Sequence, residues 1–358
     1  MPARLSLIRG DDRYHNVCAA LDALDDQIDL AGRRRVLIKP NFVATDNPLA
    51  TTHADATRAL LDFLRRRYDG PISIAEGPAV GTAAEAFARF GYQELAREYH
   101  AELLDLNHDE TIGVDARDWR LRPLRLQMAR SALESDFRIS IGPPKTHDVV
   151  IVTLSIKNMV MGTLVSRFTH AGDSQNGRGG DGGAVGRLSK LLKGIVPEWV
   201  RGLPPAEWAE FRAMSLLEPS DKMKMHQSYP VINLNLALLA PHVMPHLAVL
   251  DGYEAMEGNG PTGGTPVPLR VAVAGTDALA VDVLGAALMG FDAREVGYLH
   301  YCARLGLGTA DLAEIEVVGN ATLDECRRSF RPHDRYKRQR RWPSPRVAAQ
   351  IEAWQHGR

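Results

Sequence analysis

The sequence has few cysteines, and none of them is placed to form a disulfide framework or to hold an iron–sulfur cluster. The 358 residues include three cysteines, Cys18, Cys302 and Cys326, which lie far apart without C-x-x-C spacing. Disulfide-dependent secreted domains and cysteine-bound clusters both need several cysteines at short, regular spacings. The sequence therefore disfavours both classes of protein.

The chain also lacks a long apolar run and an excess of charge of either sign. Its most apolar window, residues 231–250, is interrupted by Asn233, Pro241 and His246, so it cannot span a bilayer. Met1–Gly10 does not have the basic start and apolar run of a signal peptide. The net charge is −1, so no overall field favours an anionic membrane or nucleic acid. We expect a cytoplasmic protein that does not bind membranes.

Common catalytic fingerprints are absent too. The chain has neither a phosphate-binding P-loop nor a G-x-S-x-G nucleophile turn. The glycines at 258, 260, 263 and 264 are not framed by a strand, a turn and a helix as in a dinucleotide site. Function must therefore be argued from single side chains and from where the fold places them.

Apolar segments with strand character alternate with segments of helical periodicity. We predict strands at residues 4–8, 36–38, 72–75, 137–141, 246–250 and 269–273, and helices at 16–30, 55–67, 230–239 and 276–288. We predict a capping box formed by Thr82 and Glu85, and an N-cap pair formed by Thr52 and Asp55. This alternation predicts an α/β fold with a mostly parallel sheet and helices on both faces.

We divide the chain into two halves of one α/β core, an insertion and a tail. The core halves are residues 1–165 and 231–325, and the basic tail is 326–358. Residues 166–230 contain a glycine-rich stretch, and we interpret them as a flexible, lid-like insertion. Alternatively, residues 166–230 are a loop without a role in the site. The basic tail is most often solvated or in contact with another subunit of a homo-oligomer.

The most informative stretch is residues 136–162. Its strand ends at Gly142-Pro143-Pro144, so Lys145 and His147 follow at a strand's carboxyl end, where open α/β sheets bind ligands. Lys157 and Asn158 then stand side by side in an apolar run. Burying a lysine is costly unless a partner neutralises it. The stretch predicts a pocket that receives an anion.

Other strand exits carry polar residues of the same kind. Lys39 and Asn41 follow one strand and Glu76 follows another. Cations and amides in a dry cleft suit a carboxylate or phosphate group, although most lysines lie at the surface. A desolvated lysine could also act as a base or nucleophile.

Acidic residues follow the later strands. Asp251 ends a strand, and Glu257 lies beyond it in a glycine-rich run that we expect to be neither helix nor strand. With Glu76, these acids suit general acid–base catalysis or a divalent metal such as Mg²⁺. Asp282 lies among apolar residues and needs a buried partner such as one of the lysines.

The residues resemble the family catalogued as domain of unknown function 362. The resemblance rests on Val36–Asn41, Thr51-Thr52-His53, Lys145-Thr146-His147, Thr153, Ile156-Lys157-Asn158, Gly162, His226, Asp251-Gly252, Glu257–Pro261, Gly264, Asp277 and Asp282. It implies an α/β fold. Many relatives carry a ferredoxin-like segment with C-x-x-C cysteines, which this chain lacks, so we expect no iron–sulfur cluster.

The resulting hypothesis is an enzyme that binds a small anionic substrate. The proposed catalytic residues are Lys145, His147, Lys157, Glu76 and Asp251. The proposed substrate-binding residues are Lys39, Asn41, Thr52, His53, Thr153, Asn158, His226, Glu257, Gly258 and Gly260. Single histidines such as His53, His147 and His226 are more often structural.

Two other functions stay open at this point. The cleft could hold a metabolite or cofactor without turnover, as in a scaffold protein. The basic tail carries interleaved aromatic residues at Phe330, Tyr336 and Trp342, which is a weak indication of nucleic-acid binding that we do not favour.

Overall fold

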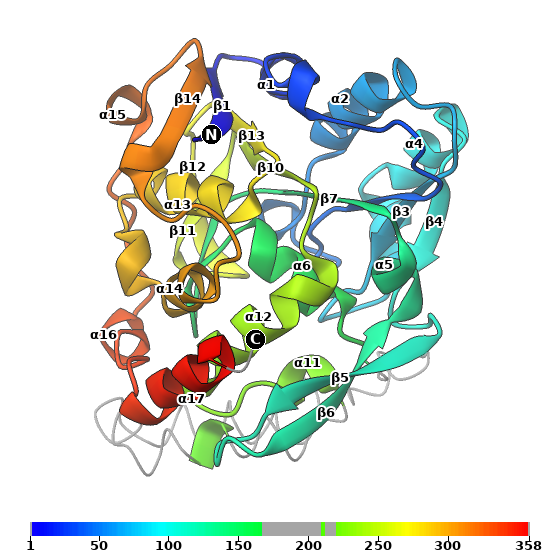
Figure 1. Cartoon of the computed structure of the whole chain (residues 1–358). Helices are drawn as coiled ribbons and strands as arrows, with labels where there is room; N and C mark the ends of the chain where they lie inside the picture. Colours follow the sequence, from blue (N-terminus) through cyan, green and yellow to red (C-terminus); the bar gives the residue numbers. More distant parts are fainter. Residues whose placement is uncertain (1, 167–208, 212–219, 357–358) are drawn as a thin grey trace.

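An eight-stranded, mostly parallel sheet forms the centre of the molecule (Figure 1). The computed structural model describes residues 2–166, 209–211 and 220–356. In spatial order the strands are β14 (Ile315–Gly319), β1 (Ala3–Arg9), β13 (Val271–Gly275), β10 (Leu247–Gly252), β7 (Phe137–Gly142), β2 (Val36–Lys39), β3 (Ile72–Glu76) and β4 (Glu102–Asp105). Strand β13 is antiparallel to both of its neighbours, and the other neighbouring pairs are parallel.

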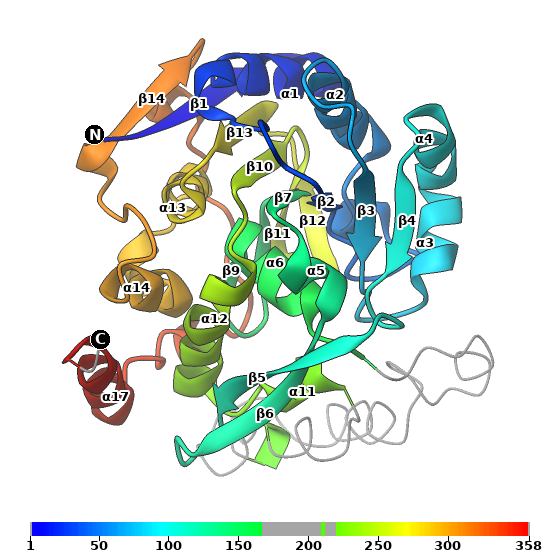
Figure 2. The ribbon, with the colours of Figure 1, turned by 45° about the vertical axis from the view of Figure 1, so that its right-hand side comes forward.

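Helices cover both faces of this sheet, as predicted (Figure 2). Side chains alternate along β2, so Val36 and Ile38 enter one apolar core while Leu37 enters the other. The first core contains α1 (Arg13–Asp22), α2 (Ala54–Arg65), α3 (Ala83–Arg89) and α4 (Tyr92–Glu98). The second contains α6 (Ser155–Thr163), α12 (Tyr229–Val243), α13 (Ala278–Leu288) and α14 (Gly297–Arg304).

A second sheet of four strands lies beyond the end of β7. Its order is β12 (Gly263–Val267), β11 (Ala255–Asn259), β8 (Lys145–His147) and β9 (Ile151–Thr153). Our expectation that the glycine-rich run after Asp251 forms neither helix nor strand was wrong. The run forms the β11–β12 hairpin, and a Cβ on Gly260 would overlap the Thr146 carbonyl, so glycine permits the close contact with β8.

The remaining elements surround these two sheets. They are the hairpin β5 (Thr111–Arg117) and β6 (Pro123–Ala129), the helices α5 (Arg130–Glu134), α11 (Asp221–Lys224), α15 (Leu323–Cys326), α16 (Tyr336–Gln339) and α17 (Pro345–His356), and the 3-10 turns Asp25–Gln27, Pro48–Ala50, Ala293–Glu295 and Leu312–Glu314. Residues of the basic tail pack on the second core through Trp342, Val347 and Ile351. The Trp342 indole also donates to the Glu295 carbonyl at 2.6 Å.

Local predictions met different outcomes. The capping box of Thr82 and Glu85 is confirmed. The first helix ends at Asp22 rather than at residue 30, because acidic residues follow where the negative end of the helix dipole lies. His53, not Thr52, caps α2, because the Thr52 hydroxyl bonds Asn41 and Ile141 instead.

Most of the predicted lid-like insertion, residues 167–208 and 212–219, lies outside the described residues. In the part of the chain that is described, none of the helices combines the length and apolarity that a bilayer span requires.

Candidate functional site

The carboxyl ends of β2 and β3 bring Lys39 and Glu76 together in a fully buried ion pair. The Lys39 ammonium donates to the Glu76 carboxylate, to the Pro40 carbonyl at 2.7 Å and to Asn158 Oδ1 at 3.0 Å. Burial lowers the pKa of Lys39 and raises that of Glu76, and their mutual attraction opposes both shifts. Three acceptors match the three N–H groups of an ammonium, so Lys39 is charged here.

Helix α6 carries Asn158 into contact with this pair, and Asp282 of α13 holds the start of the helix. The Asp282 carboxylate accepts from the backbone N–H groups of Ser155 at 2.8 Å and Ile156 at 2.9 Å, and from the Ser155 hydroxyl. Our expectation of a lysine partner for Asp282 was wrong, because the free N–H groups of a helix start satisfy a carboxylate equally well. Burial raises the pKa of Asp282 to about 7.

Glycine 162, one turn further along α6, makes room for the Lys39 side chain. A Cβ on Gly162 would overlap Lys39 Cε and Nζ. The helix therefore positions Lys39 in two ways, by the bond from Asn158 and by the absence of a side chain at Gly162.

A chain of side-chain amides connects Lys39 to Lys145. Asn158 Oδ1, which Lys39 contacts, also accepts from Asn41 Nδ2 at 2.8 Å, and Asn41 Oδ1 accepts from Lys145 Nζ. Thr52 fixes Asn41, since its hydroxyl accepts the Asn41 N–H at 2.7 Å and donates to the Ile141 carbonyl at 3.0 Å. Lys145, Asn41, Asn158, Lys39 and Glu76 thus form one continuous hydrogen-bonded network.

Lys145 differs from Lys39 in having only uncharged acceptors. Its fully buried amine donates to Asn41 Oδ1 and to the Ala50 carbonyl at 2.8 Å. Burial, together with the charge of Lys157, places the pKa of Lys145 well below its usual value. Its two acceptors match the two N–H groups of an uncharged amine, and the lowered pKa favours that form.

Two buried histidines near Lys157 have opposite tautomers. The Val149 N–H donates to His147 Nδ1 at 3.0 Å, so the proton of His147 is on Nε2. His226 Nδ1 contacts the Lys222 carbonyl at 2.8 Å, and a carbonyl only accepts, so His226 carries its proton on Nδ1. Burial lowers the pKa of His147, and that of His226 to about 4, which leaves both rings neutral.

Lys157 is a buried cation without a direct partner in the part of the chain that the structure describes. Its side chain is 5% exposed, and within the described residues its amine has neither a hydrogen bond nor an ion pair. Burial lowers the pKa of Lys157 to about 8, against the attraction of the half-exposed Asp148 carboxylate. Lys157 therefore still carries its charge at pH 7.

Thr153 adds an unsatisfied hydroxyl beside Lys145. The two residues face each other in the antiparallel β8–β9 ladder, so their side chains point to the same face. The Thr153 hydroxyl is buried, and none of the described residues provides it with a hydrogen-bond partner. Buried hydroxyls are nearly always bonded, so this one is an exception within the site.

The sequence predictions missed Lys222. Its buried amine donates to the Leu164 carbonyl, and Glu76 is the strongest charge acting on it. Burial lowers the pKa of Lys222 to about 7. Lys222 precedes His226 by four residues, about one helical turn, and this spacing could have indicated that both lie near the site. The tail residue Gln339, also missed, donates to the His147 carbonyl and helps to hold β8.

Several predicted site residues lie apart from this network. His53 is half-exposed at the start of α2, Asp251 pairs with Arg13 at 3.1 Å, and Glu257 accepts the Arg331 N–H at 2.9 Å. Gly258 accepts the Thr146 hydroxyl at 2.9 Å through its carbonyl, and with Gly260 it fits the hairpin to β8.

The three acids that we considered for a metal therefore each pair with a different cation. Lys39 neutralises Glu76, Arg13 bonds Asp251 and Arg331 bonds Glu257. Among residues 2–166, 209–211 and 220–356, no three Asp, Glu, His or Cys side chains converge as metal ligands. Magnesium binding stays an untested prediction.

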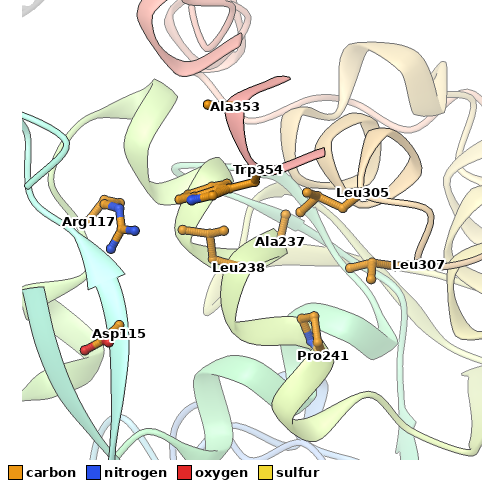
Figure 3. Close-up of a pocket in the computed structure, with 9 residues that line it drawn as sticks. All are labelled: Asp115, Arg117, Ala237, Leu238, Pro241, Leu305, Leu307, Ala353 and Trp354. Atoms are coloured by element: carbon orange, nitrogen blue, oxygen red, sulfur yellow. The ribbon is translucent and has the colours of Figure 1, made fainter. Parts of the chain in front are cut away.

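Two surface pockets lie away from the lysine network. One of them, of about 260 Å³, lies between β5, α12, the residues after α14 and α17 (Figure 3). Trp354 lies above Leu238 there, and the Arg117 guanidinium lies 5.0 Å from the Trp354 ring centre. The other pocket lies beside Arg9 and Arg270. No residue of the lysine network lines either pocket.

A family model described as Domain of unknown function (DUF362) matches residues 36–287, more than half of the chain. The chain belongs to this family. The DUF362 match contains Lys39, Glu76, Lys145, Lys157 and Asp282, and it confirms the resemblance seen in the sequence.

Among curated proteins, the chain is similar to the thylakoid-associated protein sll1697 of Synechocystis sp. The two are 22% identical over 275 residues, which are 76% of this chain and 68% of the cyanobacterial protein.

Two solved structures are similar over part of their length. The lactate racemase apoprotein of Thermoanaerobacterium thermosaccharolyticum has a TM-score of 0.36 at 12% identity, covering 68% of this chain and 50% of the other. A protein of Thermotoga maritima has a TM-score of 0.39 at 13% identity, covering 68% and 51%. The chain thus spans about half the length of either structure, and nothing about its activity follows from them.

Proposed function

We propose that this DUF362 protein is an enzyme whose small substrate carries a carboxylate or phosphate group, bound at Lys157. The observation that carries this proposal is the buried Lys157 ammonium, which is still charged at pH 7 and has no hydrogen-bond or ion-pair partner among the described residues. A buried cation without a counter-charge costs several kcal/mol, and an anionic ligand would remove that cost. The unsatisfied Thr153 hydroxyl supports the same proposal.

The histidines suit a reaction that moves a proton on the substrate. His147 can donate a hydrogen bond from Nε2, and His226 can accept a proton at Nε2. A donor and an acceptor near a fixed cation are what proton abstraction beside a carboxylate needs. This arrangement favours proton abstraction or isomerisation over group transfer. Lys145, an uncharged amine, is a further base or nucleophile.

The other predicted residues receive supporting roles in this proposal. Lys39, Asn41, Asn158, Thr52 and Glu76 position the reactive groups through the hydrogen-bonded network. Roles for Asp251, His53, Glu257, Gly258 and Gly260 at the substrate, like a cytoplasmic location, a homo-oligomer and a lid, stay predictions from the sequence.

Binding is tested by thermal unfolding with phosphate, sulfate, malonate and succinate. A ligand at about a hundred times its Kd should stabilise the protein by about 2.7 kcal/mol. Lys157→Met should abolish that response, and Lys337→Met, which removes an exposed lysine, should preserve it. Equal responses in both variants would contradict a site at Lys157.

The pH dependence of binding gives a second test. Lys157 loses its proton above pH 8, so the affinity for the anion should fall about tenfold per pH unit there. Isothermal titration between pH 7 and pH 10 measures this fall. An affinity that is constant across this range would show that a different cation holds the anion.

Turnover separates an enzyme from a binding protein. A bound carboxylate with a C–H group next to it should exchange that hydrogen for deuterium in D₂O, and proton NMR would detect the loss of the signal. His226→Asn should slow the exchange while preserving binding. Saturable binding without exchange or any other conversion would favour the alternative function, a protein that holds a metabolite.

A further inference from the structure

The hydrogen bonds of Lys145 leave one position on its nitrogen free. An uncharged primary amine has two N–H groups and one lone pair, and the Lys145 amine contacts two acceptors, Asn41 Oδ1 and the Ala50 carbonyl. Among the described residues no carboxylate pairs with it. The two N–H groups are therefore satisfied, and no donor from the described residues engages the lone pair.

The other buried lysines do not share this arrangement. Lys39 has three acceptors, one of them the Glu76 carboxylate, so its lone pair is occupied by a proton. Lys222 donates to the Leu164 carbonyl, and the negative charge of Glu76 favours its protonated form. Lys157 remains the cation that receives an anionic group in the proposed function. Lys145 is thus the amine best placed to react.

An uncharged lysine amine in a dry site adds readily to carbonyl carbon. We propose that the substrate carries an aldehyde or ketone group besides its anionic group, and that Lys145 binds it covalently as a Schiff base. This inference rests on the proposed anion site at Lys157 and names the second functional group of the substrate. Both 2-oxo carboxylates and phosphorylated aldehydes or ketones have this chemistry.

The bonds and protons of this step balance without an oxidant or a reductant. The Lys145 lone pair forms a C–N bond, and the carbonyl π electrons move to oxygen. A proton leaves the nitrogen for a base and is returned from that base to the oxygen, which gives a carbinolamine. A second proton, supplied by water or by a protonated base, lets the hydroxyl leave as water while the C=N bond forms, and the resulting iminium nitrogen gives a proton back to the group that supplied it. The net change is one water released per imine.

Thr153 is the residue placed to assist this addition. Its unsatisfied hydroxyl faces Lys145 across the β8–β9 ladder, so it can bond the oxygen of the carbinolamine. Thr153 is a candidate for stabilising the developing charge on that oxygen, in the manner of an oxyanion-binding group.

Reductive trapping tests the proposal. The full chain is incubated with sodium cyanoborohydride and either pyruvate, a 2-oxo carboxylate, or dihydroxyacetone phosphate, a phosphorylated ketone. Intact-mass measurement and peptide mapping then locate the reduced adduct. We expect one adduct per chain on Lys145 with one of the two compounds, at a rate at least tenfold above that of the exposed Lys337. The preferred compound tells which anionic group the site accepts.

Two variants and the mapped position of the adduct distinguish the outcomes. Lys145→Met should lose the adduct, and Lys337→Met should retain it. No adduct on Lys145 with either compound, or equal labelling of Lys145 and exposed lysines, would overturn the proposal. Mapping of the unaltered protein gives this result even if Lys145→Met does not fold.

The same experiment separates this inference from the proposed function. Anion binding that depends on Lys157, without a Lys145 adduct, would refute the Schiff base and leave the anion site standing. A Lys145 adduct that forms equally fast in Lys157→Met would support the reactive amine and refute the anion site at Lys157.

Discussion

Lys39 and Lys145 are both fully buried and belong to one hydrogen-bonded network, yet they differ in the groups that accept their hydrogen bonds. Lys39 contacts a carboxylate and two uncharged oxygens, whereas Lys145 contacts two uncharged oxygens alone. Desolvation lowers the pKa of both; the Glu76 carboxylate opposes this shift at Lys39 through direct contact, and at Lys145 without a hydrogen bond and against the like charges of Lys157 and Lys39. The comparison predicts that the acceptors around a buried lysine determine how strongly its charged form is stabilised.

Disrupting the Lys39–Glu76 ion pair should have the largest effect on stability. Glu76→Leu leaves the Lys39 ammonium buried without its carboxylate, which should lower the free energy of unfolding by about 3–5 kcal/mol in urea denaturation. The double variant Lys39→Met/Glu76→Leu should recover most of this loss, because apolar residues often replace a buried ion pair without penalty. A double variant that is less stable than Glu76→Leu would contradict the ion pair.

Gly162→Ala should disturb the surroundings of Lys39 without changing any charge. The added methyl group would overlap Lys39 Cε, and overpacking of this kind destabilises by about 1–3 kcal/mol. Denaturation in urea measures the change. Because alanine normally stabilises a helix interior relative to glycine by about 0.5–1 kcal/mol, a gain in stability would show that Lys39 does not lie against Gly162.

The lowered pKa of Lys145 should affect how the stability of the protein depends on pH. Because burial lowers the pKa of Lys145 in the folded protein, the unfolded chain binds more protons than the folded protein between the folded pKa and about pH 10.5. The contribution of Lys145 to the free energy of unfolding should rise with pH by about 1.4 kcal/mol per unit between the folded and unfolded pKa values.

Lys145→Met should remove this contribution. Between pH 8 and pH 10, the free energy of unfolding should therefore rise less with pH in the variant than in the unaltered protein. Urea denaturation at several pH values gives both slopes. Parallel curves for the two proteins would mean that Lys145 is charged in the folded state, and that it resembles Lys39.

Thr153→Val should have the smallest effect on stability. The substitution keeps the volume and removes a buried hydroxyl that has no partner, so the free energy of unfolding should stay unchanged or rise by about 1 kcal/mol. Anion binding or adduct formation should weaken at the same time. A loss of stability with unaltered ligand response would show that the hydroxyl serves the fold instead.

The α/β fold was predictable from the sequence because it follows from local periodicity. Strands such as β2 and β3 have runs of buried residues between turn residues, and both helix-covered faces follow from the alternation of these runs with helices. Lys39 and Glu76 could be expected near each other because parallel strands end at the same edge.

Other features depend on contacts that no local pattern reveals. Asp282 meets the start of α6 rather than a lysine, and Lys222 reaches the neighbourhood of Glu76 from a distant helix. The β11–β12 hairpin forms because its glycines pack on β8, although the glycine-rich composition favours an irregular loop. The protonation of Lys145 depends on how many acceptors surround it, which the sequence does not show.

The bond from Gln339 to the His147 carbonyl has a consequence for how the protein is made. These residues are 192 positions apart, so the ribosome exposes His147 well before it adds Gln339. At about 5–20 residues per second, that interval is about 10–40 s. During it the nascent chain already contains Lys39, Lys145 and Lys157, without the C-terminal residue that helps to hold β8. Strand β8 therefore gains this hydrogen bond only near the end of synthesis.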